Sequence, residues 1–239
     1  MKNSIAFAGL ALLMIVFSCG NPEQEHPQEA IPADYILSRS ERLLCDSLGL
    51  DSAVIVKLRD ETNEPVNQFN PELIWVKMDD GSVMQMPAGF IGIYFEADQT
   101  KAKGFVSKLG DELRKLNYTI YVCEENFGVN GAKDKVAIVS TTDMYDILRG
   151  TGTDGINFDI SNDSLCKIIH RFDDKYELTL IGCNYDWCEF TFSKEPASWT
   201  ELANECYAVC PDIVDQGTGS VEELAKEIKR TRTLYFWWD

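Results

Sequence analysis

Two short segments of the sequence place oxygen-bearing side chains close enough together to do chemistry. In the first, Asn157, Asp159, Ser161 and Asp163 occupy alternate positions, so on a strand their oxygens would share one face. Hard oxygen donors that converge in this way can hold Ca²⁺. The Gly and Glu that an EF-hand loop requires are missing from the matching positions. We therefore interpret these residues as the cap of a following helix and predict no metal site.

The second segment, Asp212–Gly219, contains two carboxylates, an amide and two glycines just after Pro211. Glycine lets a backbone approach a ligand closely, and paired carboxylates can act as acid and base when burial separates their pKa values. The same residues also suit a simple turn that ends one helix and begins the next. If the protein has a site, we expect this turn and the chain end to form it. The candidate residues are Asp154, Asn157, Asp159, Asp212, Asp215, Gln216, Trp237, Trp238 and Asp239.

Cysteine and histidine form no recognisable metal or nucleophile motif in this sequence. Cys206 and Cys210 lie one helical turn apart on an apolar face, which favours core thiols over metal ligands. Neither His26 nor His170 belongs to a cluster with zinc-binding spacing. No Ser, Cys or Lys nucleophile has a locatable His partner. We therefore predict no cofactor and no metal.

Alternating residues over 177–183 and 187–192 predict a hairpin with Tyr185 and Asp186 at its tip. This register sets Cys183 opposite Cys188, at a separation close to that of a disulfide. Export would permit oxidation, so both a Cys183–Cys188 bond and a pair of reduced thiols remain open. The same register pairs Ile181 with Phe190 and Thr179 with Phe192.

The elements that must position these residues follow from hydrophobic periodicity and turn signals. A helix is expected to begin at Ser38, where Glu41 completes a capping box, and to end near Gly49. A clear amphipathic pattern predicts a second helix over 99–117. The other elements expected in the first half are strands over 53–58, 73–78, 83–86, 89–95, 118–123 and 135–140, and a helix over 142–148.

In the second half, capping boxes at Ser198 and Ser220 each predict the start of a helix. The other predicted elements are a strand over 155–159, a helix over 164–172 and a final strand over 234–238. The order β-α-β-β-α-α-β predicts a ferredoxin-like half within an α+β protein of mixed sheets and packed helices. Because successive strand residues face opposite sides, Trp237 and Trp238 should enter different layers.

The N-terminus carries the marks of an export signal. Lys2 precedes an apolar run from Ile5 to Phe17, with small residues around Cys19, as in secretory signals. The run is 13 residues long, shorter than the roughly 20 that a membrane-spanning helix needs. Val16–Cys19 resembles the lipobox of bacterial lipoproteins. The resemblance implies cleavage before Cys19, acylation of that residue, and a stable anchor on a membrane of the cell envelope.

The acidic composition limits the partners of the protein. The whole chain has a formal charge of −17, and removal of residues 1–18 would leave 21 basic against 39 acidic side chains. Nucleic acids and anionic headgroups both need a basic surface, so neither is expected as a partner. The polar segment 20–32 has almost nothing to bury and predicts a disordered tether. The expected divisions are a signal peptide (1–18), the tether (19–33), an N-terminal α/β half (34–142) and a C-terminal domain (143–239).

Three separated blocks towards the C-terminus resemble a known bacterial family. The blocks are Asp146–Leu148 with Thr153–Asp159, then Cys210–Gly217, then Leu234–Asp239 with its terminal Trp-Trp-Asp. Similar blocks occur in this order in the DUF4253 family, and residues 143–239 are identified as a member on that basis. The resemblance implies a domain assignment and no particular activity.

Two functions remain open on these observations. We favour a non-catalytic, membrane-anchored envelope module that binds a protein or a small ligand, because the chain is acidic, tethered and without a catalytic cluster. The alternative is a hydrolase-type enzyme that uses carboxylates near Asp154, Asp159, Asp212 and Asp215. An enzyme should bring two of these carboxylates together in a pocket, with at least one perturbed pKa. A binding module should instead show an exposed apolar or aromatic patch.

Overall fold

The computed structural model describes residues 35–70, 74–77, 83–86 and 90–239. The predicted export signal, Cys19 and the predicted tether lie outside these ranges. Within the described ranges, no helix is long and apolar enough to cross a bilayer.

The strands form one mixed sheet and a separate hairpin. The large sheet has the order β1-β4-β6-β5-β7-β8-β9. All its pairs are antiparallel except β5–β7, which is parallel. Both predicted halves of the chain therefore contribute strands to the same sheet. The bounds are β1 Asn67–Phe69, β2 Ile74–Lys77, β3 Val83–Met86, β4 Gly92–Ala97, β5 Thr119–Glu124, β6 Asp134–Val139, β7 Leu178–Asn184, β8 Trp187–Phe192 and β9 Thr233–Trp237, with β2 and β3 forming the hairpin.

Three helices begin at the serines that the sequence predicts as caps. The Ser38 hydroxyl accepts a hydrogen bond from the Glu41 amide, and the Glu41 carboxylate accepts one from the Ser38 amide. Ser198 and Ser220 accept from the amides three residues later in the same way. The bounds are α1 Arg39–Leu48, α2 Ser52–Arg59, α3 Gln99–Lys115, α4 Met144–Thr151, α5 Asn162–Tyr176, α6 Trp199–Val209 and α7 Val221–Thr231, with short turns η1 Val129–Gly131, η2 Ile156–Phe158 and η3 Ile213–Thr218.

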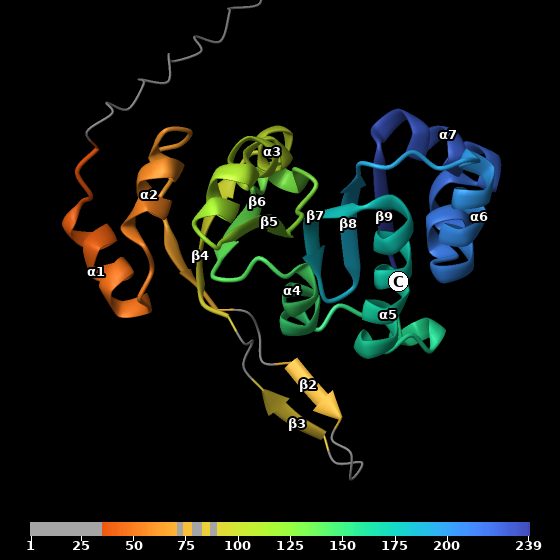
Figure 1. Ribbon diagram of the computed structural model, residues 1–239, viewed down its shortest axis with the longest axis horizontal. Coiled ribbons are helices and arrows are strands. Elements are labelled where there is room, and N and C mark those ends of the chain that lie inside the picture. Colours follow the sequence, from red (N-terminus) through yellow and green to blue (C-terminus); the bar gives the residue numbers. More distant parts are fainter. Residues whose placement is uncertain (1–34, 71–73, 78–82, 87–89) are drawn as a thin grey trace, which may run out of the picture. The chain divides into compact units, whose positions relative to one another are not determined.

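A hydrophobic core lies on each face of the sheet. Side chains of α1, α2 and α3 pack on one face, and those of α4 to α7 pack on the other; α6 and α7 lie side by side (Figure 1). Successive side chains of β9 therefore enter different cores. Phe236 and Trp238 enter the α4–α7 core, whereas Tyr235 and Trp237 pack against the α1–α3 core. The prediction that the two tryptophans enter different layers is confirmed.

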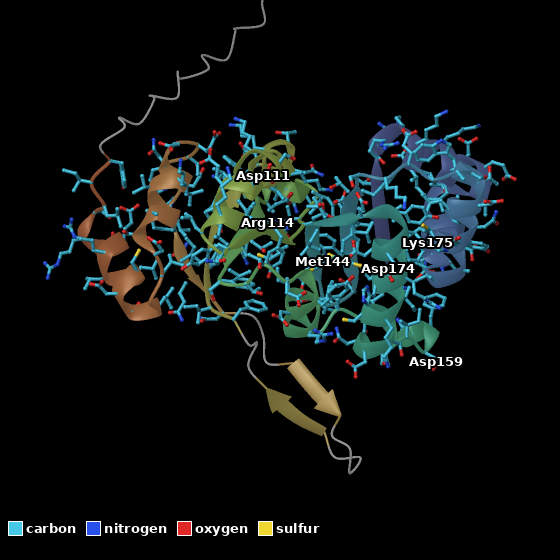
Figure 2. The ribbon with its side chains drawn as sticks, viewed as in Figure 1. Asp111, Arg114, Met144, Asp159, Asp174 and Lys175 are labelled. Carbon is cyan, nitrogen blue, oxygen red and sulfur yellow. The ribbon has the colours of Figure 1, made fainter. Side chains whose placement is uncertain are left out.

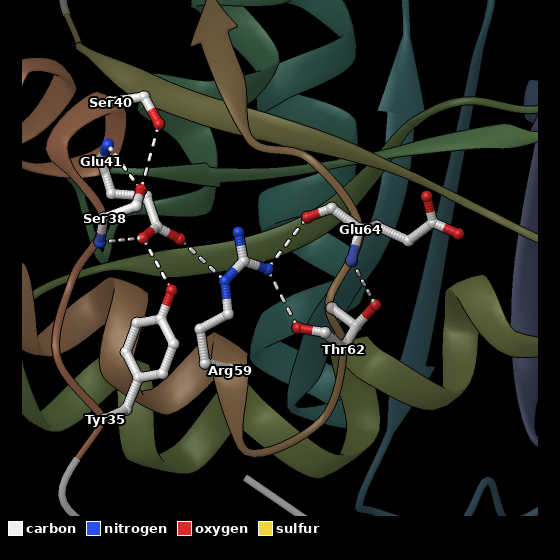
Figure 3. A network of polar contacts seen from close by, with 7 residues as sticks. All are labelled: Tyr35, Ser38, Ser40, Glu41, Arg59, Thr62 and Glu64. Atoms are coloured by element: carbon white, nitrogen blue, oxygen red, sulfur yellow. Dashed lines mark hydrogen bonds and ion pairs between the residues drawn. The ribbon is translucent and has the colours of Figure 1, made fainter. Parts of the chain in front are cut away.

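A buried ion pair joins α1 to α2 (Figure 3). Arg59 Nε lies 2.8 Å from Glu41 Oε1, and the guanidinium also donates to two backbone carbonyls that follow α2. Burial acts to raise the pKa of Glu41, but hydrogen bonds from Tyr35, Ser38 and Arg59 outweigh it and lower that pKa to about 2. Because a lone buried charge is costly, the pair fixes α1 on α2.

Two segments predicted as strands form helices instead. Residues 53–58 were expected as a strand because they are rich in Val and Ile, yet they belong to α2. The Asp51 carboxylate caps this helix by accepting from the Ala53 amide, and Val54, Ile55 and Leu58 are fully buried. Packing and capping thus override a local preference for strand. The predicted strand over 155–159 is the short helix η2, flanked by an isolated bridge between Gly155 and Ile160.

The α+β class is confirmed, but the second half does not have ferredoxin-like strand order. Its strands β7, β8 and β9 are consecutive neighbours. A β-α-β unit of this kind lies instead in the first half. It consists of β4, α3 and β5, and β6 lies in the sheet between the parallel strands β4 and β5. Segment order alone cannot distinguish these arrangements, because pairing between the halves decides which strands become neighbours.

The hairpin β7–β8 has the predicted register at its tip and a shifted one beyond it. Cys183 opposes Cys188, as expected. A bulge between Leu180 and Gly182 then changes the partners, so that Leu180, not Ile181, opposes Phe190. The bulge turns Ile181 into the α1–α3 core. Both cysteines are free thiols here, as are the others in the described ranges, and the disulfide stays a prediction.

Candidate functional site

A cavity of about 360 Å³ opens where β5 and β7 separate. The parallel ladder between these strands contains a single residue pair, Val122 with Gly182. Before that pair the strands diverge, and α3 on one side and the start of α4 on the other complete the walls. The cavity therefore lies between the two parts of the sheet that the β5–β7 contact joins.

The inner wall of the cavity is apolar. Val106 from α3, Ile120 from β5, and Leu180 and Ile181 from β7 all line it and are all buried. These side chains belong to both hydrophobic cores, because Leu180 and Ile181 are successive strand residues and point to opposite faces of the sheet. The floor can thus exclude water from an apolar group of a ligand.

The opening of the cavity is charged. Asp111 and Arg114 reach it from α3, and Asp143 and Met144 from the start of α4; Figure 2 shows Asp111 and Arg114 on α3 and Met144 on α4. Asp111, Arg114 and Asp143 are exposed. Within the described residues, neither Asp111 nor Arg114 takes part in an ion pair or side-chain hydrogen bond. Arg114 therefore offers its guanidinium donors to solvent or to a ligand.

A fourth charged group at the cavity already has partners. Asp173 accepts one hydrogen bond from the Tyr145 hydroxyl at 3.0 Å and another from the Leu178 amide at 2.8 Å. Burial, followed by the bond to Asp173, raises the pKa of Tyr145. Tyr145 stays a neutral donor, and Asp173 serves to hold α5, α4 and β7 together at this wall.

Four of the residues predicted from the sequence do meet, at the C-terminal end of β9. Asp212 is buried and accepts from the Asp239 amide and from the Gln216 side chain, both at 3.0 Å. The Trp238 indole donates to the Val209 carbonyl. Because both Asp212 oxygens have protein partners, this arrangement holds the chain end in place. We assign it a structural role.

The predicted segment 154–159 lies against the same chain end. A Cβ at Gly155 would be 2.8 Å from the Trp238 indole nitrogen, so only glycine allows this packing. The Asp154 amide donates to the Tyr185 carbonyl, and burial raises the pKa of the Asp154 carboxyl. Asn157 and Asp159 are exposed.

The remaining predicted residues lie apart from the group at the chain end. Asp215 is exposed and accepts from Tyr207, and Trp237 faces the other side of the sheet. In the described ranges, no hydrogen bond or ion pair joins any two of the carboxylates of Asp154, Asp159, Asp212 and Asp215. No group of three His, Cys, Asp or Glu side chains there has a geometry that could hold a metal.

Exposed apolar side chains also occur near the chain end. Ile156 is 63% exposed and Tyr185 is 65% exposed, and the loops that carry them are joined by the bond between Asp154 and Tyr185.

One charged cluster was not predicted from the sequence at all. Lys103 of α3 lies 2.5 Å from a carboxylate oxygen of Glu189 in β8 and 2.9 Å from one of Glu125. The Tyr235 hydroxyl of β9 donates to the other oxygen of Glu125. Both glutamate side chains are only 7% exposed. The sequence signal is Glu189 itself, a charged residue between buried aromatic positions of a strand.

Two buried carboxylates share one ammonium in this cluster, so one negative charge is left over. Burial raises the pKa of Glu189, Lys103 opposes that shift, and Glu125 adds to it. The cluster links α3 to β8 and β9, and its excess charge is a cost that the fold tolerates.

Glu189→Gln should therefore raise the free energy of unfolding at neutral pH. A raised carboxyl pKa means that the folded protein binds the proton more tightly than the unfolded chain does, so stability falls as pH rises through the folded pKa. Gln removes this loss while Lys103 keeps Glu125 as its partner. The gain should vanish below the ordinary pKa of 4.5, where Glu189 is protonated in both states. Urea unfolding at neutral and acidic pH measures both values.

Glu112→Gln is the matched control for this change. Glu112 is exposed on the same helix as Lys103, and its bond to Lys57 lowers its pKa, so no gain at neutral pH is expected. A Glu189→Gln protein that is less stable than the parent at neutral pH would show that the Lys103 ion pair outweighs the cost of burial.

The comparisons with known proteins assign the C-terminal part of the chain. Residues 135–239 match the family model of DUF4253, a domain of unknown function. No match to a curated protein or to a solved structure was found. The resemblance read from the sequence blocks is confirmed, with a match that begins earlier, inside β6. The C-terminal part of this chain, residues 135–239, is thus similar to the DUF4253 family.

Proposed function

We propose that the protein is a non-catalytic lipoprotein of the cell envelope, and that it binds a small ligand in the cavity between β5 and β7. The proposal rests on the properties of this cavity. It combines a buried apolar floor with charged groups that lack partners among the described residues, and these are the features of small-molecule sites.

No comparable observation favours the alternative function, a hydrolase that uses carboxylates as acid and base. Asp212 uses both carboxylate oxygens to hold the chain end. Asp215 accepts a hydrogen bond from Tyr207, Asp154 accepts one from the Ile156 amide, and Asp159 is exposed. A catalytic pair needs two groups aimed at one substrate position, and no two of these four carboxylates share a partner among the described residues.

The membrane anchor in this proposal rests on Cys19 and the lipobox resemblance. Cys19→Ala should move the protein from the membrane fraction to the soluble fraction, because acyl chains would be lost and the acidic chain has no basic surface to replace them. Fractionation followed by a salt wash measures the distribution.

Cys45→Ala, which removes a thiol elsewhere, should leave the protein in the membrane fraction. A Cys19→Ala protein that stays in the washed membrane pellet would contradict the anchor.

Ligand binding in the cavity can be tested before the ligand is known. Gly110 and Gly104 both lie inside α3, and neither has an atom within 4 Å of where its Cβ would be. Gly110 lines the cavity and Gly104 does not. Gly110→Leu should fill the cavity, whereas Gly104→Leu should leave it open.

The measurement is mass spectrometry of small molecules released by denaturation from protein purified out of the native envelope. At least one compound should accompany the parent and Gly104→Leu proteins and be depleted from Gly110→Leu. The same set of compounds in all three proteins would show that the cavity is not the binding site.

A further inference from the structure

We propose that the ligand of the β5–β7 cavity is a zwitterion with an apolar side chain, of the size of an amino acid or a dipeptide. This inference rests on the proposed function and adds the chemical class of the ligand. It follows from the charges at the opening, the nature of the floor, the volume, and one glycine of α3.

The charges at the opening are mixed in sign. Arg114 is the positive side chain that lines the cavity, and Asp111 and Asp143 are negative groups beside it. One oxygen of Asp143 caps α4 by accepting from the Tyr145 amide, which leaves the other available. Asp173 is occupied by its own hydrogen bonds.

This charge pattern selects between ligand classes. A simple anion would pair with Arg114 but would meet two carboxylates nearby. A simple cation would pair with Asp111 or Asp143 but would leave Arg114 unpaired and repelling it. A ligand with a carboxylate and an ammonium satisfies both signs, and Arg can bind a carboxylate through two parallel hydrogen bonds.

The floor and the volume define the rest of the ligand. Val106, Ile120, Leu180 and Ile181 present aliphatic surface beneath the charged opening, so a group that reaches them must be apolar to be bound favourably. The volume of about 360 Å³ lies at the lower end of the range for small-molecule pockets, about 300–1,000 Å³. A single amino acid or a dipeptide fits these limits.

Gly110 keeps room for a ligand at this wall. Glycine inside a helix is unfavourable relative to alanine, and close packing is the usual reason to keep one. No atom lies within 4 Å of a Cβ built at Gly110, so packing within the described protein does not require glycine here. The open space beside it belongs to the cavity, where a side chain would take up room that a ligand could use.

The closing experiment uses defined compounds and calorimetric titration of the full-length protein. The probes are leucine, isoleucine, valine, methionine and phenylalanine, each also as its homodipeptide. The tightest binder is then compared with its N-acetyl form, which keeps only the carboxylate, and with its amide, which keeps only the ammonium. Inorganic phosphate serves as a simple anion.

At least one zwitterionic probe should bind, and both blocked forms should bind at least about tenfold more weakly, a difference of about 1.4 kcal/mol. Phosphate should not compete. Arg114→Gln should weaken binding by at least the same factor. Lys115→Gln removes the same charge from the next position of α3, outside the cavity lining, and should not change the affinity.

Failure of this inference is distinguishable from failure of the proposed function. If no probe binds, or if the amide or the N-acetyl form binds as tightly as the zwitterion, the ligand class is wrong. The proposed function would still stand if Gly110→Leu, but not Gly104→Leu, loses a compound from the native envelope.

Discussion

The parallel contact between β5 and β7 is the constraint on which the rest of the structure depends. It joins the strands before it to those after it through a single residue pair, Val122 and Gly182. A Cβ on Gly182 would lie 2.8 Å from the Val122 carbonyl oxygen and 2.6 Å from the Trp187 ring. Real Cβ atoms do not approach other atoms so closely, so the two parts of the sheet can meet only because this residue is glycine.

The cavity is a consequence of how short this contact is. A longer parallel ladder would close the space between β5 and β7 with backbone hydrogen bonds. Here the strands diverge before Val122, and side chains of α3, β5 and β7 line the space between them. Lys103 then holds α3 to the second half of the sheet through Glu125 and Glu189. The ligand site and the ion cluster are thus both products of one junction.

Local features of this protein could be predicted from the sequence, and features of the junction could not. Capping serines, the amphipathic helix α3 and the opposition of Cys183 and Cys188 depend on neighbouring residues, and the structure has all of them. The helix α2 was missed because burial of its Val and Ile residues against other elements outweighs their preference for strands. The bulge at Ile181 was missed because the alternating pattern predicts a continuous register.

The candidate site could be predicted from the sequence even less well than the fold. The residues chosen for their chemistry, such as Asp212 and Asp239, meet each other and hold the chain end. The cavity instead combines residues from α3, β5, α4, α5, β7 and β8, and no spacing rule connects them. The one local signal is the pair of glycines in α3; both face open space, and only Gly110 lines the cavity.

The most direct test of this account is the free energy of unfolding of Gly182→Ala, measured by urea denaturation. The account predicts a loss of about 1–3 kcal/mol, the usual cost of overpacking, because the new methyl group would force β5 from β7 or displace the Trp187 ring. Gly217→Ala is the control, since the nearest atom to its Cβ would be 3.7 Å away, and it should cost much less. A Gly182→Ala protein as stable as the parent would contradict the account, because the strands would then not need glycine to meet.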